Sequence, residues 1–265
     1  MVVGADGRPT ICLNLIVKNE SHVIHELFES VAQYIDYWVV VDTGSTDGTQ
    51  DLIRREMDRL GIPGELHERP WRDFGHNRSE AIQLAQGHCD YIWVMDADDM
   101  LVGRPEFRNL TADTYLMLID DGVLYWRRQL FRDGVPWRDQ GVLHGLAVCD
   151  SPTTEGRLGG DFRVLSRRIG GRNLDPHKYR RDAEILLAEV QRNPDDPRSV
   201  FYLAQSYYCY GDWANSRKWD ERRAEMGGWA EEVYYSSFRA AEAMAANNDP
   251  WPEVQDAYLR AWNMR

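Results

Sequence analysis

The sequence lacks three features that would each indicate a class of protein. No apolar run approaches the ~18 residues of a membrane-spanning helix, and no signal-peptide hydrophobic segment stands near its start. Basic residues are not in excess, since 31 Lys and Arg stand against 43 Asp and Glu, for a net charge of −12. That balance argues against a general nucleic-acid binder. We therefore expect a soluble cytoplasmic protein with no membrane span and no nucleic-acid partner.

Cysteine is also scarce in this chain of 265 residues. Cys12, Cys89, Cys149 and Cys209 are widely spaced and form no Cys-x-x-Cys pair. This spacing favours neither a zinc cluster nor a disulfide framework. We interpret them as buried free thiols in a reducing compartment.

Two apolar segments that end at aspartate are the strongest positive signal. Residues 38–41 read Trp-Val-Val-Val before Asp42, and residues 91–95 read Tyr-Ile-Trp-Val-Met before Asp-Ala-Asp-Asp at 96–99. Such β-branched and aromatic runs predict buried strands. Open α/β sheets bind ligands at the carboxyl edge of their strands. A divalent cation with a phosphate is the usual compensation for acids clustered there.

The chain divides into two patterns. Short apolar runs alternate with amphipathic stretches up to about residue 99, which predicts a mostly parallel sheet covered on both faces. Asp-Asp-Gly at 120–122 predicts a hairpin, and further strand-like pieces at 142–148 and 162–165 predict antiparallel additions. From Asp182 the pattern is purely helical, and Gly-Asp-Trp at 211–213 matches the turn of one tetratricopeptide repeat. We therefore expect an α/β domain over residues 1–181 and an all-α, tetratricopeptide-like domain over 182–265.

The segment 96–99 is the candidate metal-binding motif. Residues two apart in an extended strand end point the same way, so Asp96 and Asp98 can face one point while Ala97 stays out of the way. Carboxylate oxygens suit Mg²⁺ or Mn²⁺, which would bridge to a diphosphate. The alternative for this motif alone is a solvated acidic loop, and for residues 42–48 it is a capped turn between a strand and a helix.

A basic segment lies between Arg157 and Arg181, with eight Lys or Arg and two Asp. We expect residues 170–172 and 177–181 to form a mobile flap that stabilises negative charge on a leaving diphosphate. Arg172, His177 and Lys178 are its candidate phosphate contacts, and His177 is also a candidate metal ligand. The alternative is a solvated basic surface against the acidic helical domain.

Four ordered motifs resemble family 2 glycosyltransferases of the GT-A fold. They are Ile-Val-Lys-Asn-Glu at 16–20, the segment 40–49, Asn77-Arg78 before a helix, and the segment 96–99. The resemblance is closest to a bacterial and phage subgroup with tetratricopeptide-like helices after the catalytic domain. It implies a Rossmann-like GT-A domain, a nucleotide diphosphate sugar donor, most simply a UDP-sugar, and Mn²⁺ or Mg²⁺ as cofactor. The sugar would pass to a protein or glycan acceptor with inversion of the anomeric carbon.

The resemblance also implies roles for individual residues. Asp42 matches the acid that hydrogen-bonds the nucleotide base, and Glu20 lies beside the ribose. Arg78 matches a residue that pairs with the diphosphate or the base. Asp98 matches the metal ligand, and Asp96 lies near the ribose and is a further candidate ligand. The other nucleotide-sugar contacts that it implies are Val17, Asn19, Gly44, Ser45, Asn77 and Ala97.

The catalytic base is less well defined by the resemblance. The subgroup commonly has Glu after the histidine of the segment matching 141–145, and this chain has Gly145 there. His144 is a candidate third metal ligand, because a neutral imidazole suits Mn²⁺, and a core or hairpin histidine is the alternative. Asp139 is the nearest acid that can act as base. Asp99 is expected to assist at the metal or to contact the donor sugar.

Other hypotheses stay open at this point. Asp120 and Asp121 compete with Asp139 as base, although their Asp-Asp-Gly context favours a solvated turn. A metal-dependent phosphatase also uses Asp-x-Asp after a strand, and a helical-repeat scaffold would explain only residues 182–265. With no acid at 145, an inactive transferase that only binds nucleotide is a further alternative. For the helical domain we expect a protein acceptor or a homodimer contact, since repeats present binding surfaces.

Overall fold

The computed structural model describes residues 7–265, and it divides the chain into two compact units. The first contains the residues up to Gln140 together with Gly145–Leu174, and the second contains Gly141–His144 together with Asp175–Arg265. The main division therefore falls at residue 174 and not at the predicted 181. It does so because the helical pattern begins earlier than Asp182, at the α4 helix (Lys178–Arg192).

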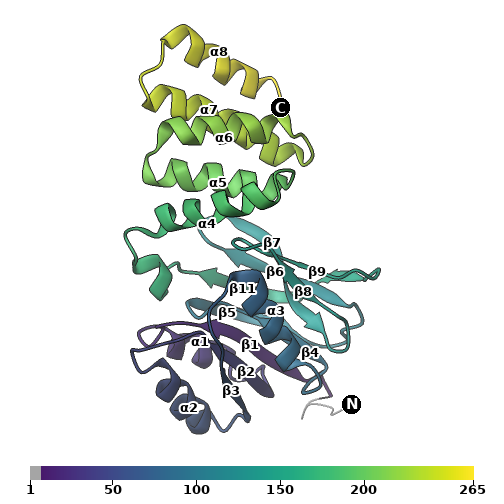
Figure 1. Cartoon of the computed structure of the whole chain (residues 1–265). Coiled ribbons are helices and arrows are strands. Elements are labelled where there is room, and N and C mark those ends of the chain that lie inside the picture. The colour runs from purple at the N-terminus through teal and green to yellow at the C-terminus, as the bar shows by residue number, and fades with distance from the viewer. Residues whose placement is uncertain (1–6) are drawn as a thin grey trace. The chain divides into compact units, whose positions relative to one another are not determined.

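The first unit is built on a nine-stranded mixed sheet with the order β3-β2-β1-β4-β7-β6-β11-β5, in which β10 also pairs with β6 (Figure 1). Its strands are β1 (Ile11–Val17), β2 (Tyr37–Asp42), β3 (Gly64–Glu68), β4 (Tyr91–Val94), β5 (Asp99–Glu106), β6 (Thr114–Asp120), β7 (Leu124–Arg132), β10 (Glu155–Arg157) and β11 (Gly159–Ser166). The β3-β2-β1-β4 strands run parallel, whereas β7 is antiparallel to both its neighbours and β5 to β11. A separate two-stranded sheet pairs β8 (Arg138–Gln140) with β9 (Leu146–Val148). The predicted α/β class with antiparallel additions is confirmed.

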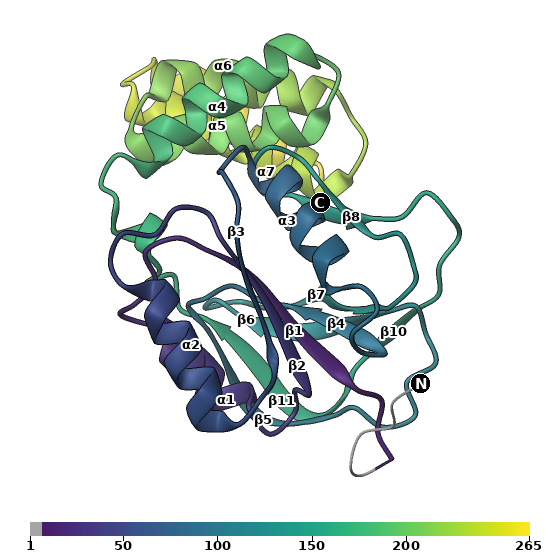
Figure 2. The same cartoon turned by 60° about the horizontal axis from the view of Figure 1, so that its bottom comes forward.

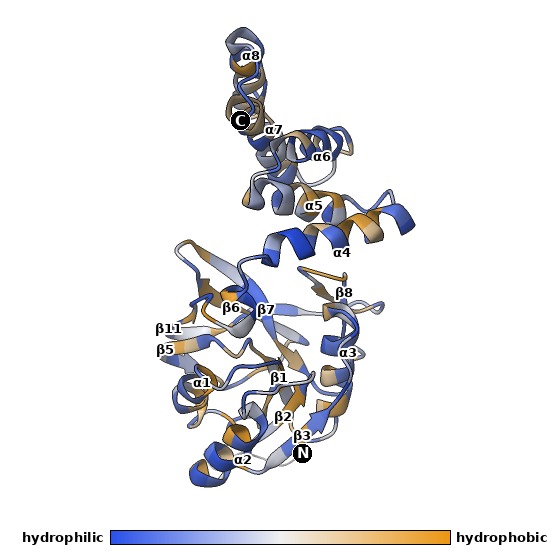
Figure 3. Ribbon diagram, turned by 60° about the vertical axis from the view of Figure 1, so that its left-hand side comes forward, coloured by the Kyte–Doolittle hydropathy of each residue, from blue (hydrophilic) through white to orange (hydrophobic). Residues whose placement is uncertain are grey.

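Helices cover both faces of this sheet (Figure 2). The α1 (Ile24–Val31) and α2 (Thr49–Leu60) helices pack with Leu13 and Val40, and α3 (Phe74–Ala85) packs with Cys12 and Val39. Successive strand residues point to opposite faces, so strands buried on both sides are apolar throughout. Figure 3 accordingly colours much of β2 as hydrophobic. This double burial explains the continuous apolar runs that precede the aspartates.

The three helices of this unit begin in different ways. No side chain caps α1, and the backbone amide of Ser21, just before this helix, donates to the Asp47 carboxylate at 3.1 Å. The α2 helix follows Gly48, whose φ of 87° suits glycine, and it has no side-chain cap either. The α3 helix begins before Asn77, because the Asp73 carboxylate accepts an amide of the first turn at 2.8 Å.

The second unit is all-α and begins with α4. Its other helices are α5 (Pro197–Tyr210), α6 (Trp213–Glu225), α7 (Ala230–Ala246) and α8 (Trp251–Trp262), which follow one another side by side (Figure 1). Asp196 caps α5 by accepting two backbone amides, and Gly211 ends it at φ 87°. Asp212 then caps α6. The predicted turn at 211–213 is therefore present, with Gly211 at the end of α5 and Asp212 as the cap of α6.

Charged side chains lie in the core of this unit. Asp220 and Arg239 are 0% and 2% exposed, and the Arg239 guanidinium donates to the Asp220 carboxylate, with Nε at 2.8 Å from Oδ2. Arg223 donates to Glu232 at 2.9 Å nearby. Figure 3 colours α6 largely hydrophilic, although it packs between α5 and α7. Paired charges thus replace part of an apolar core.

Two expectations about absences can be compared with the structure. Within residues 7–265, no helix combines the length and the apolar content that a bilayer crossing requires. All four cysteines are free thiols, as expected. Of the four, only Cys12 is fully buried, and Cys209 is exposed. The expectation that all four thiols are buried is therefore confirmed only in part.

Candidate active site

The two acidic segments meet at one edge of the sheet. The β1 strand pairs in parallel with both β2 and β4, so the carboxyl ends of all three strands lie together. Val17 stands opposite Asp42, and its carbonyl accepts from the Thr43 amide at 2.9 Å. Residues 96–99 follow β4 with only Met95 between. This juxtaposition agrees with the sequence prediction.

Asp42 is buried and uses its two oxygens differently. Its Oδ1 accepts from the amides of Gly44 and Ser45, both at 2.9 Å, and from Gln50 Nε2 at 3.1 Å. Its Oδ2 is buried and accepts no hydrogen bond from any described residue. A buried acceptor without a partner is costly. This oxygen is therefore suited to receive a donor from a ligand.

The loops after β1 and β2 are tied to each other. The Asn19 amide donates to Ser45 Oγ at 2.8 Å, and Asn19 Oδ1 accepts from the Thr46 amide at 2.8 Å. The Glu20 amide donates to Thr49 Oγ1 at 2.8 Å. Asn19 and Ser45 are predicted to contact the ligand. In the structure, these atoms instead fix the conformation of the two loops at the edge of the site.

Glu20 and Asp98 lie on either side of a glycine pair. Asp98 Oδ2 accepts from the Gly170 amide at 2.8 Å, and Glu20 Oε2 accepts from the Gly171 amide at 3.0 Å. A side chain at Gly170 would place its Cβ 3.1 Å from Glu20 Oε2 and 3.2 Å from Asp98 Oδ2. Glycine therefore lets the backbone approach both carboxylates. Burial raises the pKa of Glu20 to about 7, with the Asp98 charge adding to the rise and the Gly171 amide opposing it.

We expect Glu20→Gln to weaken the pH dependence of the first unit's stability. The Glu20 carboxyl binds its proton more tightly in the folded than in the unfolded protein, so it makes the folded state less stable as pH rises from 4.5 towards about 7. Urea unfolding in EDTA at about pH 5 and about pH 8 would measure this loss for both proteins. An equal loss in the wild type and the variant would contradict the assignment.

Asp96 is held between two arginines. Arg78 of α3 donates to Asp96 Oδ1, and Arg127 Nη2 of β7 lies 3.8 Å from Oδ2. Burial favours a higher pKa for Asp96, but these two charges outweigh it and the pKa is lowered. Asp99 is fully buried beside it, with Oδ2 3.6 Å from Arg127 Nη2. Burial, with Asp96 second, raises the pKa of Asp99 to about 7.

The countercharge for the acids differs from the prediction. We expected it from the basic segment, whereas Arg127 on β7 supplies part of it together with Arg78. Of the residues expected as a flap, Gly171 and Arg172 lie in the short 3₁₀ helix η1 (Gly171–Leu174), and residues 178–181 lie in α4. Arginines of the basic segment form ion pairs with other acids, among them Arg163 with Asp120, Arg167 with Glu26, Arg168 with Asp121 and Arg181 with Asp175. Nothing local in the sequence marks Arg127, because the antiparallel pairing of β7 with β4 brings it there.

Phe74, at the start of α3, contacts two guanidinium groups. The Arg172 Cζ lies 4.7 Å and the Arg78 Cζ 5.9 Å from its ring centre. Asn77 is fully buried and shapes the preceding loop, since Nδ2 donates to the Pro70 carbonyl at 3.1 Å. Arg172 and Arg78 thus lie against the same aromatic ring. The predicted contact Ala97 is 5% exposed and packs in the core.

Of the strand expected over 142–148, only the last three residues form one, as β9, and residues 141–145 connect β8 to β9. His144, at φ 51°, groups with the second unit, where its ring stacks on Tyr202 at 4.0 Å and its carbonyl accepts from Arg198 Nε at 2.9 Å. His177 and Lys178 also group with that unit, so their roles stay predictions. Among residues 7–265, no three His, Cys, Asp or Glu side chains form a cluster that could hold a metal.

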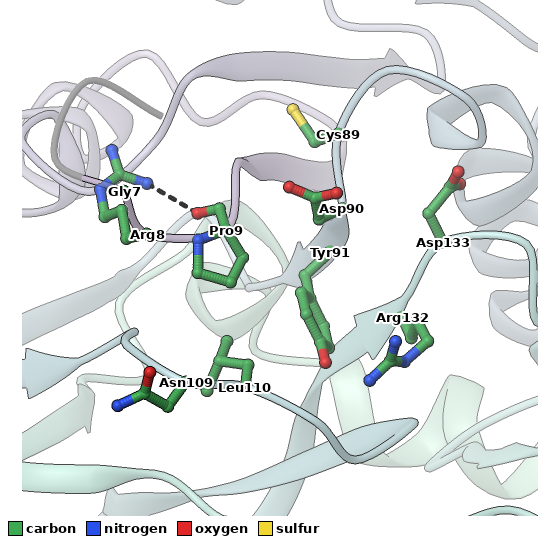
Figure 4. Close-up of a pocket in the computed structure, with 10 residues that line it drawn as sticks. All are labelled: Gly7, Arg8, Pro9, Cys89, Asp90, Tyr91, Asn109, Leu110, Arg132 and Asp133. Carbon is green, nitrogen blue, oxygen red and sulfur yellow. Dashed lines mark hydrogen bonds between the residues drawn. The ribbon is translucent and has the colours of Figure 1, made fainter. Parts of the chain in front are cut away.

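A pocket of 430 Å³ lies at the other end of these strands (Figure 4). Its lining includes Pro9 before β1, Asp90 and Tyr91 at the start of β4, and Arg132 at the end of β7. Asp96 follows the opposite end of β4. This pocket is therefore separate from the acidic site.

Comparisons with known proteins find similarity in the part of the chain that contains Asp42, Asp96 and Asp98. Residues 13–102 match the model described as glycosyl transferase family 2. The SPbeta prophage-derived glycosyltransferase SunS of Bacillus subtilis is 33% identical over 93 residues, which cover 35% of this chain and 21% of SunS. A TPR repeat-containing protein of Synechococcus elongatus is 34% identical over 102 residues, which cover 38% of this chain and 23% of that protein.

These alignments span less than a quarter of the length of either relative. A solved structure of S. aureus TarS in complex with UDP-GlcNAc is 14% identical, with a TM-score of 0.46. That match covers 95% of this chain and 92% of the TarS chain.

Proposed function

We propose that this chain, whose residues 13–102 match the model described as glycosyl transferase family 2, transfers a sugar from a nucleotide diphosphate donor to an acceptor. The donor is most simply a UDP-sugar, and the acceptor is a protein or a glycan. The observation that carries the proposal is that Asp42, Asp96 and Asp98 lie at the carboxyl ends of β2 and β4, the two strands that pair in parallel with β1 on either side. Ligands of open α/β sheets bind at this edge.

The nucleotide would lie across this edge. Asp42 Oδ2, buried and without a partner among the described residues, would accept a hydrogen bond from the base. Glu20 and Asp96 would lie beside the ribose. Arg78 and Arg172, both against Phe74, would face the diphosphate, for which the planar guanidinium fork is well suited.

A divalent cation fits the residues present. Asp98 offers a carboxylate held by one backbone amide, and Glu20 lies beside the same glycine pair. Mg²⁺ and Mn²⁺ sites of this kind use one or two carboxylates and take further oxygens from the phosphates, so a protein cluster of three ligands is not required. Asp98 would hold the ion, with Asp96 a further candidate. The bound ion would neutralise charge on the diphosphate.

For the second unit we propose a role on the acceptor side. Its α5–α6 pair has the caps and the turn of a tetratricopeptide repeat, and stacked repeats present extended binding surfaces. A homodimer through residues 182–265 is the alternative use of this surface. Light scattering of the full chain would distinguish them, because a monomer at all concentrations would reject the dimer.

Mass spectrometry with a panel of nucleotide sugars tests the proposed function. The full chain with Mn²⁺ should release nucleoside diphosphate from one donor class, by transfer or by slow hydrolysis, and EDTA should stop the release. No turnover of any UDP- or GDP-sugar, with a folded protein and candidate acceptors present, would argue for the nucleotide-binding alternative.

A further inference from the structure

We propose that Asp99 is a positioning residue, which contacts neither the ion nor the sugar and instead fixes the turn that carries Asp96 and Asp98. The proposal rests on the proposed transferase function, because it concerns how the ligand of the ion is held. It assigns Asp99 a role different from the metal or sugar contact expected from the sequence. Asp99 acts through the backbone of Asp96, to which its side chain is bonded.

Exposure alternates along residues 96–99. Asp96 and Asp98 are partly exposed, whereas Ala97 and Asp99 are buried, at 5% and 0%. The Asp99 carboxylate therefore has no surface on which an ion or a sugar entering from solvent could bind. Burying a carboxylate is costly unless the protein compensates for it. The reason for an acid at this position must accordingly lie within the protein.

The end of β4 provides that reason. The Met95 amide still bonds to β1, since it donates to the Asn14 carbonyl at 3.2 Å. The next amide, that of Asp96, instead donates to Asp99 Oδ2 at 3.1 Å. In return, the Asp99 amide donates to the Asp96 carbonyl at 3.0 Å. These two reciprocal hydrogen bonds close a turn of four residues.

The far end of the turn is fixed by different contacts. Asp99 is the first residue of β5, which pairs with β11. After β11, Arg167 Nε donates to the Asp98 carbonyl at 2.9 Å, and the Gly170 amide donates to Asp98 Oδ2 at 2.8 Å. The segment after β11 thus fixes Asp98, whereas the Asp99 side chain fixes Asp96. Without that side chain, the two acids would no longer keep a fixed separation.

Arg127 compensates for the buried charge. Its Nη2 lies 3.6 Å from Asp99 Oδ2 and 3.8 Å from Asp96 Oδ2, so one guanidinium serves both carboxylates. An arginine partner lowers the cost of burying a carboxylate. Asp99 Oδ1 accepts no hydrogen bond from any described residue. The directional contact of this side chain is therefore the bond from the Asp96 amide to Oδ2.

Two substitutions distinguish positioning from direct contact. Asp99→Asn keeps an oxygen that can accept the Asp96 amide, whereas Asp99→Leu has a similar shape and no acceptor. Calorimetry of the full chain gives the Mn²⁺ concentration needed for half-maximal UDP binding. This concentration should rise about 10- to 100-fold in Asp99→Leu, the usual effect of losing a group that orients a metal ligand. In Asp99→Asn it should stay close to the wild-type value.

Asp90→Leu is the matched control, because Asp90 accepts the Thr10 amide at 2.8 Å at the opposite end of β4. It should lower the melting temperature without changing the Mn²⁺ requirement, so a general loss of stability is distinguished from a displaced ligand.

A loss in Asp99→Asn as large as in Asp99→Leu would overturn the inference, because the carboxylate itself would then bind the ion or the sugar. A wild-type Mn²⁺ requirement in folded Asp99→Leu would overturn it as well. If Asp99→Leu does not fold, Asp99→Ala removes the same acceptor and gives the same comparison. A wild type that binds no UDP, or that binds it without Mn²⁺, would instead contradict the proposed function itself.

Discussion

Replacing Asp42 with asparagine is expected to weaken nucleotide diphosphate binding by about 100-fold, because a hydrogen bond to a buried charged group contributes roughly 1.5–3 kcal/mol. Asparagine can keep the amides of Gly44 and Ser45 on Oδ1, so the turn stays formed. It then presents an N–H in place of Oδ2, the oxygen that no described residue uses. A base that donates to this position would meet a second donor. Calorimetric titration with UDP measures the change.

Gln50→Ala is the matched control for this experiment. It removes one donor to Asp42 Oδ1 at 3.1 Å and leaves Oδ2 unchanged. We expect it to bind UDP nearly as well as the wild type. If Asp42→Asn binds UDP with wild-type affinity and a wild-type melting curve, Asp42 does not contact the base. An unfolded Asp42→Asn would show that the main role of Asp42 is to stabilise its turn and not to bind the nucleotide.

Replacing Arg239 with methionine is expected to destabilise the second unit by about 3–5 kcal/mol, the usual cost of leaving one member of a buried ion pair alone. Asp220 would lose its guanidinium partner while 0% exposed. Its pKa is already raised by burial, with the Arg239 hydrogen bonds and charge opposing that rise. Hydrogen exchange of α6 and α7 peptides in the full chain would measure the loss in the affected unit.

The double variant Arg239→Met/Asp220→Leu separates the charge from the packing. Replacing both members with apolar groups removes the unpaired charge, so we expect most of the lost stability to return. A double variant as unstable as Arg239→Met would mean that the shape of Arg239, including its bond to the Phe201 carbonyl at 3.1 Å, matters more than its charge.

The acid-terminated strands could be predicted because their signal is local. An apolar run that is buried on both faces is visible in sequence, and so is the aspartate that ends it. The β5 strand could not be predicted in the same way, since Gly103, Arg104 and Pro105 disfavour a strand. It forms through eight-residue antiparallel pairing with β11, which the local sequence does not reveal. Asp99 is consequently the buried first residue of a strand and does not lie in a loop.

The site shows the same division between local and tertiary signals. Asp42 ends β2, and Asp96 and Asp98 come after β4, so the sequence predicts their place at the sheet edge. Arg127 reaches the acids through the pairing of β7 with β4, which the sequence does not predict. The reason for glycine at 145 is also tertiary, because a Cβ there would collide with the Asp139 carboxylate.

Calorimetric titration of UDP into the full chain, in Mn²⁺ and in EDTA, is the decisive test of a metal-dependent nucleotide site. We expect binding that requires Mn²⁺, and Asp98→Ala should lose it because the proposed ligand of the ion is removed. The same titration with GDP covers a donor with a different base. Failure of both nucleotides to bind in Mn²⁺, or equal binding in EDTA and by Asp98→Ala, would contradict a metal-dependent nucleotide-sugar site at this edge.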